Sequence, residues 1–533
     1  MKGLATTLFA LVVVAIVSAW AWLGAPVQMP PSPLEPDKNP YCISYAPFRG
    51  DQSPFGPDVP IDRRQIESDL VQLKPITNCV RTYSIDHGLD QIAEVAQAHG
   101  MRVLQGLWLS NRPERSRQQV ETAIALAKRF PDVIAAVVVG NEVLLRGEMS
   151  APEVIRTIRE VRGQVSMPVT YADVWEFWLR YRDVAAAVDF ITIHILPYWE
   201  DFPIPARDAA AHVEAIRRRM VAAFPDKEVL LGEFGWPSFG RMRAGALPSP
   251  VNQARTMHEV LARAKSEGYR VNLIEAYDQP WKRHLEGAVG GHWGLFDAYR
   301  RAPKFAWGGA VSNHPDWSWQ AAGGVVLAAI IFVTGFAARR RPVDKVHTGF
   351  WLRIAVIAIV SASLSGWTLK NIPLESLTVG DWLRSVAWAA VALLAPMCVG
   401  AALASGAGIP SFARILGRAA QRPRDRLELS LGVLLIALAV LALQAALGLV
   451  FDPRYRDFPF APLTGAVVPF LVLTGWKGRP KAPAAEHVAA AALALSAVYI
   501  AFNEGFANWQ AVWFSAGLLA LAFTLLQARD APG

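Results

Sequence analysis

The second half of the chain is dominated by apolar runs that are long enough to cross a lipid bilayer. Seven such runs lie in the second half, and one more run, Leu4–Leu23, lies near the N-terminus and follows the basic residue Lys2. Since about 20 apolar residues span the hydrocarbon core, these runs predict a helical membrane domain. Their middles hold almost no ionisable residues, which favours an anchor or docking surface over an ion-coupled transporter. The seven runs of the second half lie near 321–338, 350–368, 384–404, 428–450, 460–476, 486–503 and 509–527.

The positive charge of the chain is placed in a way that indicates membrane orientation rather than nucleic-acid binding. The 533 residues carry a net charge of +8, but many basic residues lie in three short loops between apolar runs. With eight spans, all three loops fall on one side, which an excess of Lys and Arg marks as cytoplasmic. The segment between the first two spans is then predicted to lie outside the cytoplasm. The loop residues are Arg339, Arg340, Arg341 and Lys345; Arg414, Arg418, Arg422, Arg424 and Arg426; and Lys477, Arg479 and Lys481.

The remaining boundaries follow from composition. Residues 1–24 are predicted to be an N-terminal membrane anchor, because the apolar run is long for a signal peptide and no clean A-x-A site follows it. A cleaved signal peptide is the alternative. Residues 25–40 are rich in proline and predict an extended tether. A soluble domain then occupies 41–310, and a transmembrane domain with about seven helices occupies 320–528.

The soluble domain alternates short apolar runs with helical patterns, which predicts an α/β fold, a (β/α)8 TIM barrel. Its length agrees with the ~250 residues typical of this barrel. A doubly wound sheet is the alternative, but the Gly-rich loop that usually follows its first strand is missing from the sequence. The predicted strands are Tyr41–Ala46, Asn78–Tyr83, Arg102–Leu107, Ala135–Glu142, Pro168–Ala172, Phe190–His194, Val229–Glu233 and Asn272–Ala276. Helical patterns include Arg63–Leu73, Leu89–Ala98, Arg115–Lys128, Ala151–Gln164 and Val251–Lys265.

The three cysteines leave one question open. Cys42 and Cys79 lie near the ends of neighbouring predicted strands, and they form either a disulfide in an oxidising compartment or two buried thiols. Cys398 lies in an apolar run. The sequence holds no Cys-x-x-Cys motif and no Cys/His cluster, so it predicts neither a metal site nor a cofactor.

Two glutamates directly follow apolar strands, Glu142 after the fourth and Glu233 after the seventh. Catalytic groups of such barrels lie at the C-terminal ends of the strands, so these two carboxylates should face each other across the barrel mouth. Glycoside hydrolysis uses two carboxyl groups that flank the scissile bond. Each glutamate alone fits a structural hydrogen-bond acceptor or an ion pair equally well. Other polar or aromatic strand ends are Arg81 and Tyr83, Asn141, Asp173 and Trp175, His194, and Glu275 with Tyr277.

Several ordered motifs between residues 41 and 307 resemble glycoside hydrolase family 17. Val-Gly-Asn-Glu-Val around Glu142 resembles its acid/base segment, and Gly-Glu-Phe-Gly-Trp-Pro-Ser from Gly232 resembles its nucleophile segment. Arg81-Thr-Tyr83, the group formed by Glu275, Tyr277, Asp278 and Lys282, and the closing Gly294-Leu-Phe agree with the same family. The segment His194-Ile-Leu-Pro-Tyr198 departs from the plant enzymes, which carry Asn-x-Tyr-Pro-Tyr there. Subsites are therefore expected to differ from those of the plant enzymes.

The resemblance implies a retaining enzyme on a (β/α)8 barrel. Glu142 is expected to be the general acid/base, with a pKa raised towards neutrality, and Glu233 the nucleophile. Asn141 would donate to the sugar 2-hydroxyl. Among the remaining substrate-site candidates, Arg81 and Tyr83 would either orient Glu233 or fill the barrel interior, and Asp173 and His194 would be either sugar-binding or structural groups. The aromatic candidates Trp175, Tyr198 and Trp236 would either stack on sugar or pack against protein. Glu275 and Lys282 would form a supporting ion pair.

Three functions are compatible with the sequence: a membrane-bound β-glucan transglycosylase, a hydrolytic β-1,3-glucanase, and a glucan-binding or export component. The intact glutamate pair counts against the last. The polytopic half favours the first, because it would place the enzyme beside a glucan synthase or exporter. The chain also resembles bacterial membrane proteins of the family that are linked to β-1,3/1,6-glucan synthesis. The expected partners are β-glucan, membrane lipid and such a synthase or exporter, and no nucleic acid is expected. The expected location is a bacterial inner membrane, with the barrel in the periplasm.

Overall fold

The computed structural model describes residues 2–34, 42–56, 60–299, 302–338, 348–417, 423, 425–477 and 483–527. The chain divides into two compact units, Val27–Val311 and a second one made of Met1–Pro26 with Ser312–Gly533. Of the basic residues predicted to mark the cytoplasmic loops, only Arg414, Arg426 and Lys477 fall within the described residues.

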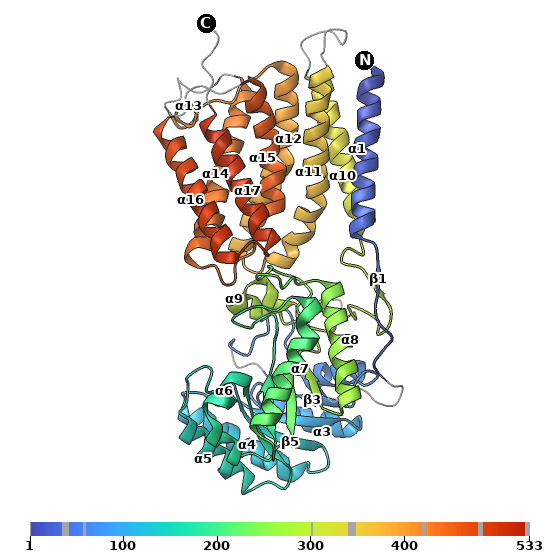
Figure 1. Cartoon of the computed structure of the whole chain (residues 1–533), viewed down its shortest axis with the longest axis vertical. Coiled ribbons are helices and arrows are strands. Elements are labelled where there is room, and N and C mark those ends of the chain that lie inside the picture. Colours follow the sequence, from blue (N-terminus) through green and yellow to red (C-terminus); the bar gives the residue numbers. More distant parts are fainter. Residues whose placement is uncertain are drawn as a thin grey trace. The chain divides into compact units, whose positions relative to one another are not determined.

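The first unit is built around a closed barrel of eight parallel strands, each paired with the next along the chain (Figure 1). β9 closes the ring on β2, with Cys42 opposite Asn272 and Ile43 opposite Leu273. This confirms the predicted (β/α)8 barrel and rules out the doubly wound alternative. The strands are β2 (Cys42–Ser44), β3 (Cys79–Arg81), β4 (Arg102–Leu107), β5 (Ile134–Asn141), β6 (Val169–Val174), β7 (Ile191–His194), β8 (Val229–Phe234) and β9 (Val271–Leu273).

Helices cover the outside of the barrel, and their sequences explain where they begin. α5 (Ala151–Arg162) starts with a capping box in which Ser150 and Glu153 satisfy each other's backbone N–H groups. Its buried residues Val154, Ile158 and Val161 follow the spacing of one helix face. The other long helices are α2 (Arg63–Leu73), α3 (Ile92–Ala98), α4 (Pro113–Arg129), α6 (Trp175–Arg180), α7 (Ala206–Ala223) and α8 (Pro250–Glu267).

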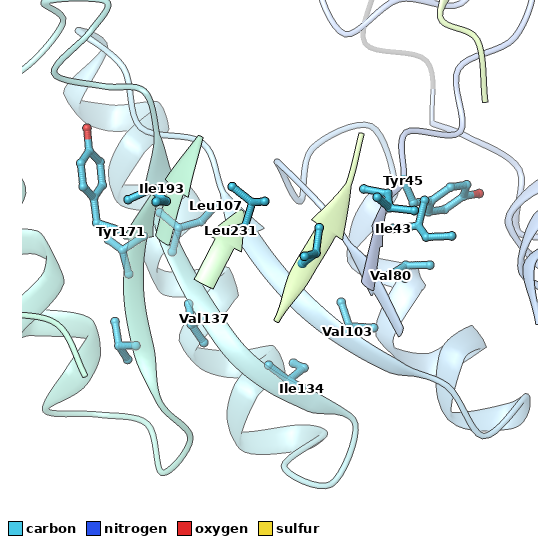
Figure 2. Close-up of a cluster of buried hydrophobic side chains, with 14 of the residues drawn as sticks. Ile43, Tyr45, Val80, Val103, Leu107, Ile134, Val137, Tyr171, Ile193 and Leu231 are labelled. Carbon is cyan, nitrogen blue, oxygen red and sulfur yellow. The ribbon is translucent and has the colours of Figure 1, made fainter. Parts of the chain in front are cut away.

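Alternate residues of the barrel strands pack into two different hydrophobic clusters, one outside the barrel and one inside it. Ile43, Val80 and Val137 belong to the large cluster between the strands and the surrounding helices, part of which Figure 2 shows. Their sequence neighbours point into the barrel, as the period of two in a strand requires. There Cys42, Cys79, Leu104, Ala136, Val138, Ala172, Phe190 and Leu230 form a separate apolar cluster.

Cys42 and Cys79 form a disulfide inside this barrel cluster, which answers the question that the sequence left open. The two Cα atoms lie 4.5 Å apart on the neighbouring strands β2 and β3. The bridge therefore links the first two strands of the barrel from within.

Part of the proline-rich stretch is ordered by pairing with a distant segment. β1 (Val27–Gln28) pairs antiparallel with β10 (Ala310–Val311). The Gln28 side chain also donates to the Gly308 carbonyl at 2.8 Å. Residues 35–40 of the predicted tether lie outside the described residues.

Within the residues that the structure describes, the second unit contains eight helices that are long and apolar enough to cross a membrane. α1 packs against α10 and α11, where Trp20 is buried and donates through Nε1 to the Ser363 carbonyl at 3.2 Å. The approach is close, because a Cβ at Gly366 would lie 2.8 Å from the Trp20 ring. The helices are α1 (Lys2–Leu23), α10 (Trp317–Ala337), α11 (Thr348–Glu375), α12 (Val379–Ser405), α14 (Arg426–Phe451), α15 (Phe460–Lys477), α16 (Ala484–Glu504) and α17 (Trp509–Leu526), with the short α13 (Phe412–Leu416) between α12 and α14.

Candidate active site

The strand β5 ends in a tight turn that carries Glu142 to the C-terminal mouth of the barrel. Gly140 has a φ of +89°, and a Cβ there would come within 2.8 Å of the Val143 side chain. Glu142 itself has a φ of +54°, a left-handed conformation that costs a non-glycine residue free energy and that often marks a functional site. Its backbone is fixed by bonds from Glu142 N to the Ala172 carbonyl and from Arg146 N to the Glu142 carbonyl.

Tyr171 and Asp173 of β6 support the segment that follows Glu142. The Tyr171 hydroxyl donates to Asp173 and accepts from the backbone N–H of Leu144, while the N–H of Leu145 also points to Asp173 at 3.4 Å. Burial is the main cause that raises the pKa of Asp173 to about 6. Asp173 is fully buried, so of its two predicted roles the structure supports the structural one and not sugar binding.

Glu233 lies deeper in the barrel, at the end of β8, with its side chain only 6% exposed. Arg81 approaches through Nη1 at 3.1 Å and the Tyr83 hydroxyl at 2.9 Å, both on Oε1. Burial and the negative charge of Glu233 keep the pKa of Tyr83 well above its usual value, so the phenol stays a donor. The positions of Arg81 and Tyr83 agree with the predicted orienting role.

Ser44 and Asn272 extend this network and were missed from the sequence. Ser44 Oγ lies 2.7 Å from the Tyr83 hydroxyl, and Asn272 Nδ2 donates to Ser44 Oγ at 2.8 Å and to the Gly232 carbonyl at 2.7 Å. The sequence did hold a signal for both residues, because each is a polar residue within a short, otherwise apolar strand. Because buried polar side chains are normally hydrogen-bonded, such a residue is expected to be bonded to another polar group there.

Arg81 also connects the two predicted catalytic strands. Its Nη2 donates to Oδ1 of Asn141 at 2.5 Å. This bond uses the acceptor Oδ1 of Asn141, whereas the donor of the amide, Nδ2, is not used by Arg81. This orientation fits the expectation that Asn141 donates to a sugar hydroxyl.

Arg146 is a second cation at the mouth that sequence reasoning missed. It donates to the carbonyls of Asn141 and Leu109 and to Glu148, and its guanidinium lies 4.3 Å from the centre of the Trp108 ring. Arg146 and Tyr171 therefore both hydrogen-bond to the segment around Glu142. No motif distinguished Arg146 from the many surface arginines of the sequence.

His194 lies between the two glutamates. Its Nδ1 is 2.8 Å from Oε1 of Glu142, and its Nε2 is 3.6 Å from Oε1 of Glu233 and 3.4 Å from Nη1 of Arg81. The ring is fully buried. Of the two predicted roles, sugar binding is therefore contradicted, because both ring nitrogens face protein groups.

The two carboxylates are close enough for a retaining mechanism. One oxygen of Glu142, one of Glu233 and a nitrogen of His194 all lie within 4.8 Å of one another. Retaining glycosidases separate their carboxyl groups by about 5–5.5 Å, whereas inverting enzymes need roughly 6.5–9.5 Å to admit a water. The Glu142 side chain is 24% exposed and the Glu233 side chain 6%. Glu142 is thus the more accessible partner, as a group that exchanges protons with solvent should be.

The expectation of a raised pKa for Glu142 is wrong for the substrate-free molecule. Burial raises the pKa, but the hydrogen bond from His194 and the positive charges of His194, Arg146 and Arg81 outweigh burial and lower it below the usual value. Sequence reasoning missed this because it did not place a basic ring against Glu142.

The same three side chains are of types that ligate metals, but the guanidinium of Arg81 already contacts two of them. Glu142, His194 and Glu233 offer ligand atoms within 4.8 Å of one another. Arg81, however, fixes a positive charge against both Glu233 and His194. The arrangement is better suited to holding and moving protons.

Glu275 and Lys282 form the predicted pair, with Lys282 Nζ donating to Oε1 of Glu275 at 2.8 Å. Burial raises the pKa of Glu275 to about 7, although Lys282 opposes the shift. Both side chains are largely buried. Their mutual bond agrees with the predicted supporting role.

The predicted aromatic subsite is only partly supported. Tyr198 and Trp236 are fully buried, and their polar atoms donate to the carbonyls of Arg241 and Leu247. Stacking and packing were both left open for these rings, and their full burial agrees with packing. Trp175 is half-buried beneath the guanidinium of Arg219, 4.9 Å from its ring centre, and remains a candidate.

Comparisons with known proteins agree on the class of this barrel. The family profile of the BtgE/BtgC glycoside hydrolase domain matches residues 42–294. The chain is 28% identical to a glucan 1,3-β-glucosidase of Arthroderma benhamiae, over 46% of this chain and 84% of that one. It is 24% identical to a glucan 1,3-β-glucosidase of Saccharomyces cerevisiae, over 43% and 80%.

A solved structure also resembles part of the chain. The glycoside hydrolase family 17 β-1,3-glucanosyltransferase of Rhizomucor miehei is 26% identical, covers 50% of this chain and 95% of its own, and gives a TM-score of 0.43. Residues 42–294 of the chain thus resemble the BtgE/BtgC glycoside hydrolase domains, in agreement with the resemblance to glycoside hydrolase family 17.

Proposed function

We propose that the protein is a membrane-bound, retaining β-glucan transglycosylase that elongates or branches β-1,3-glucan through a glycosyl–enzyme intermediate. The observation that carries the catalytic part is the close pair of Glu142 and Glu233, whose oxygens lie within 4.8 Å. The β-glucan substrate is inferred from the names of the relatives, which are glucan 1,3-β-glucosidases.

In the first step Glu233 attacks the anomeric carbon, the glycosidic C–O bond breaks, and its electron pair goes to the leaving oxygen. Arg81 and Tyr83 hold the attacking carboxylate in place through hydrogen bonds to its Oε1. Glu142 supplies the proton to the leaving oxygen. In the second step Glu142 takes a proton from the incoming hydroxyl, whose oxygen displaces Glu233. Asn141 donates to the 2-hydroxyl of the sugar, a contact that strengthens in the transition state.

Hydrolysis is the second candidate, and the names of the relatives favour it. Both reactions use the same intermediate, and they differ only in whether water or a sugar hydroxyl accepts the glucosyl chain. The transferase is preferred because eight apolar helices would station the enzyme in a membrane, beside a glucan synthase or exporter. A nutritional hydrolase has no evident use for such a membrane half.

We further propose that the barrel lies outside the cytoplasm, in the periplasm if the membrane is a bacterial inner membrane. Disulfides persist in oxidising compartments, and Cys42 is bonded to Cys79. The basic loops of the sequence support the same orientation. The burial of Trp20 against α11 supports α1 as a retained helix rather than a cleaved signal peptide.

The test is to incubate the purified full chain in detergent with a laminari-oligosaccharide labelled at its reducing end. The proposed transferase produces labelled or unlabelled chains longer than the substrate. Products that are only shorter, with no new branch points, would establish the hydrolase instead. The Glu233→Ala variant serves as control and should be inactive in either case.

A further inference from the structure

His194 makes a contact that the two-carboxylate mechanism does not require. Glycoside hydrolysis needs one carboxyl group to give and take a proton and a second to attack. Here a buried imidazole bonds through Nδ1 to the first, at 2.8 Å from Oε1 of Glu142. The position follows β7, where the plant enzymes that the sequence resembles carry asparagine.

The surroundings of the ring restrict how its protons are arranged. Nε2 faces Nη1 of Arg81 at 3.4 Å, and arginine only donates. Nε2 therefore has two possible states. Either it accepts a hydrogen bond from Arg81, or it carries a proton that the charge of Glu233, 3.6 Å away, stabilises. In the first case the neutral ring has its proton on Nδ1 and donates it to Glu142. In the second the ring is an imidazolium against a Glu142 carboxylate.

The charges around the ring come from four further strands or turns and nearly balance. Arg81 of β3 and Arg146 after β5 are positive, and Glu233 of β8 and Asp173 of β6 are acidic groups that face it or Glu142. No single neighbour therefore fixes the charge of the His194–Glu142 pair. A proton can be added to the pair or removed from it without leaving a large uncompensated charge.

We propose that His194 is a positioning residue that shares the transferable proton of Glu142, so that the pair, rather than Glu142 alone, acts as the acid/base. The inference rests on the proposed role of Glu142. Before reaction the pair holds one extra proton, mainly on Nδ1. As the C–O bond breaks, the leaving oxygen takes a proton from Glu142, and the extra proton of the pair is consumed. The incoming hydroxyl returns one proton to the pair in the second step, so the cycle balances.

This arrangement also accounts for an acid/base carboxyl whose pKa is lowered at rest. An imidazole ordinarily holds its proton to a higher pH than a carboxyl, about 6.5 against about 4.3. The pair therefore keeps a transferable proton at a pH at which an isolated carboxyl has lost it. After the first step the neutral ring keeps its other proton, on Nε2, and Nδ1 can accept the proton that the Glu142 carboxylate takes from the incoming hydroxyl.

The test compares His194→Asn with the unchanged full chain in detergent, because asparagine still donates a hydrogen bond but does not titrate. The measured quantity is kcat/KM for laminaripentaose as a function of pH. The expected result is a shift of the alkaline limb to lower pH by about one unit or more, hence a loss of roughly tenfold or more at neutral pH. Most of the loss should be recovered at acidic pH. His194→Gln, measured in parallel, guards against a folding failure of one variant.

His212→Asn is the matched control, since His212 bonds to a glutamate, Glu200, at 3.0 Å but not to either catalytic carboxylate. Its pH profile should equal that of the unchanged chain. A substrate with a dinitrophenol leaving group adds a second readout, because it departs without a proton. His194→Asn should form the glycosyl–enzyme from this substrate at an almost unchanged rate.

The inference is overturned if His194→Asn and His194→Gln lower kcat/KM equally at every pH, or equally for both substrates, because that is the signature of a purely structural role. Failure of the proposed function looks different: Glu142→Ala would then leave cleavage of laminaripentaose intact. The two failures are therefore separable in one set of measurements.

Discussion

The Tyr83 hydroxyl lies 2.9 Å from Oε1 of Glu233 and 2.7 Å from Oγ of Ser44. A phenol has one proton, so the two bonds are compatible when Tyr83 donates to the carboxylate and Ser44 donates to Tyr83. The nucleophile is thus held by a neutral donor as well as by the charge of Arg81.

Replacing Tyr83 with phenylalanine should weaken the nucleophile while leaving the barrel folded. A hydrogen bond to a charged group contributes about 1.5–3 kcal/mol, which corresponds to a loss of roughly 10- to 150-fold in kcat/KM. Tyr45→Phe is the matched control, since Tyr45 donates to Asp69 at 2.9 Å and not to a catalytic glutamate. Equal activities of Tyr83→Phe and Tyr45→Phe would contradict the role of Tyr83.

Removing the acid/base should produce a defect that an added nucleophile repairs. In Glu142→Ala the glycosyl–enzyme still forms from an activated substrate but is not resolved by water. Azide needs no general base, so it should restore turnover and yield a glucosyl azide of the same anomeric configuration as the substrate. Chromatography and NMR of the product check this. Rescue in Glu233→Ala with the β-azide as product would contradict the assignment, since that variant lacks the nucleophile of the double displacement.

The disulfide should contribute measurably to the stability of the barrel. Cys42 and Cys79 are 37 residues apart in sequence, and closing a loop of this size stabilises the native state by about 3–4 kcal/mol in the chain-entropy account. The double variant Cys42→Ala/Cys79→Ala should therefore unfold at lower temperature, as followed by tryptophan fluorescence. Cys398→Ala, which removes the free cysteine of α12, is the control and should leave the transition unchanged. A double variant as stable as the parent would contradict the structural role of the bridge.

His258 should make the stability of the first unit fall at acidic pH. Its Nδ1 donates to the Ala254 carbonyl at 2.7 Å, and its Nε2 accepts from the Gly308 N–H at 2.8 Å, so the folded ring is neutral. Burial lowers the pKa of His258 below its usual value. The unfolded chain then binds a proton, near pH 6.5, that the folded chain excludes, and the free energy of unfolding decreases as pH falls through that value.

The variant His258→Gln isolates this effect from other titrating groups. The difference in melting temperature between the parent and His258→Gln should shrink or reverse as the pH falls from 7 to 5, because only the parent loses stability through this group. A difference that stays constant over this range would contradict the prediction.

The fold was readable from the sequence because its signals are local. Each barrel strand is a short and largely apolar run, and all eight were found, with β4 over the predicted Arg102–Leu107. The eight apolar helices were found for the same reason, since length and composition alone define them. The pairing of β1 with β10 was missed, because two-residue strands leave no periodic pattern.

The site was less readable because it depends on which way side chains point. Glu142 and Glu233 could be paired by counting strands, and the structure brings them together. Tyr198 was expected to stack on sugar but lies fully buried, since a Pro-Tyr motif does not say whether the ring faces the cleft or the core. The contact of His194 with Glu142 depends on the barrel geometry and on the left-handed backbone of Glu142, which the sequence does not reveal.

The central claim, that Glu233 attacks the sugar in a retaining mechanism, is tested most directly by trapping the intermediate. A 2-fluoro laminaribiosyl fluoride slows the second step more than the first, so the full chain should accumulate a covalent glycosyl–enzyme. Peptide mass spectrometry should then find the modification on Glu233, and Glu233→Gln should carry none. A modification on another residue, or an active enzyme that accumulates no adduct and releases products of inverted configuration, would contradict the account.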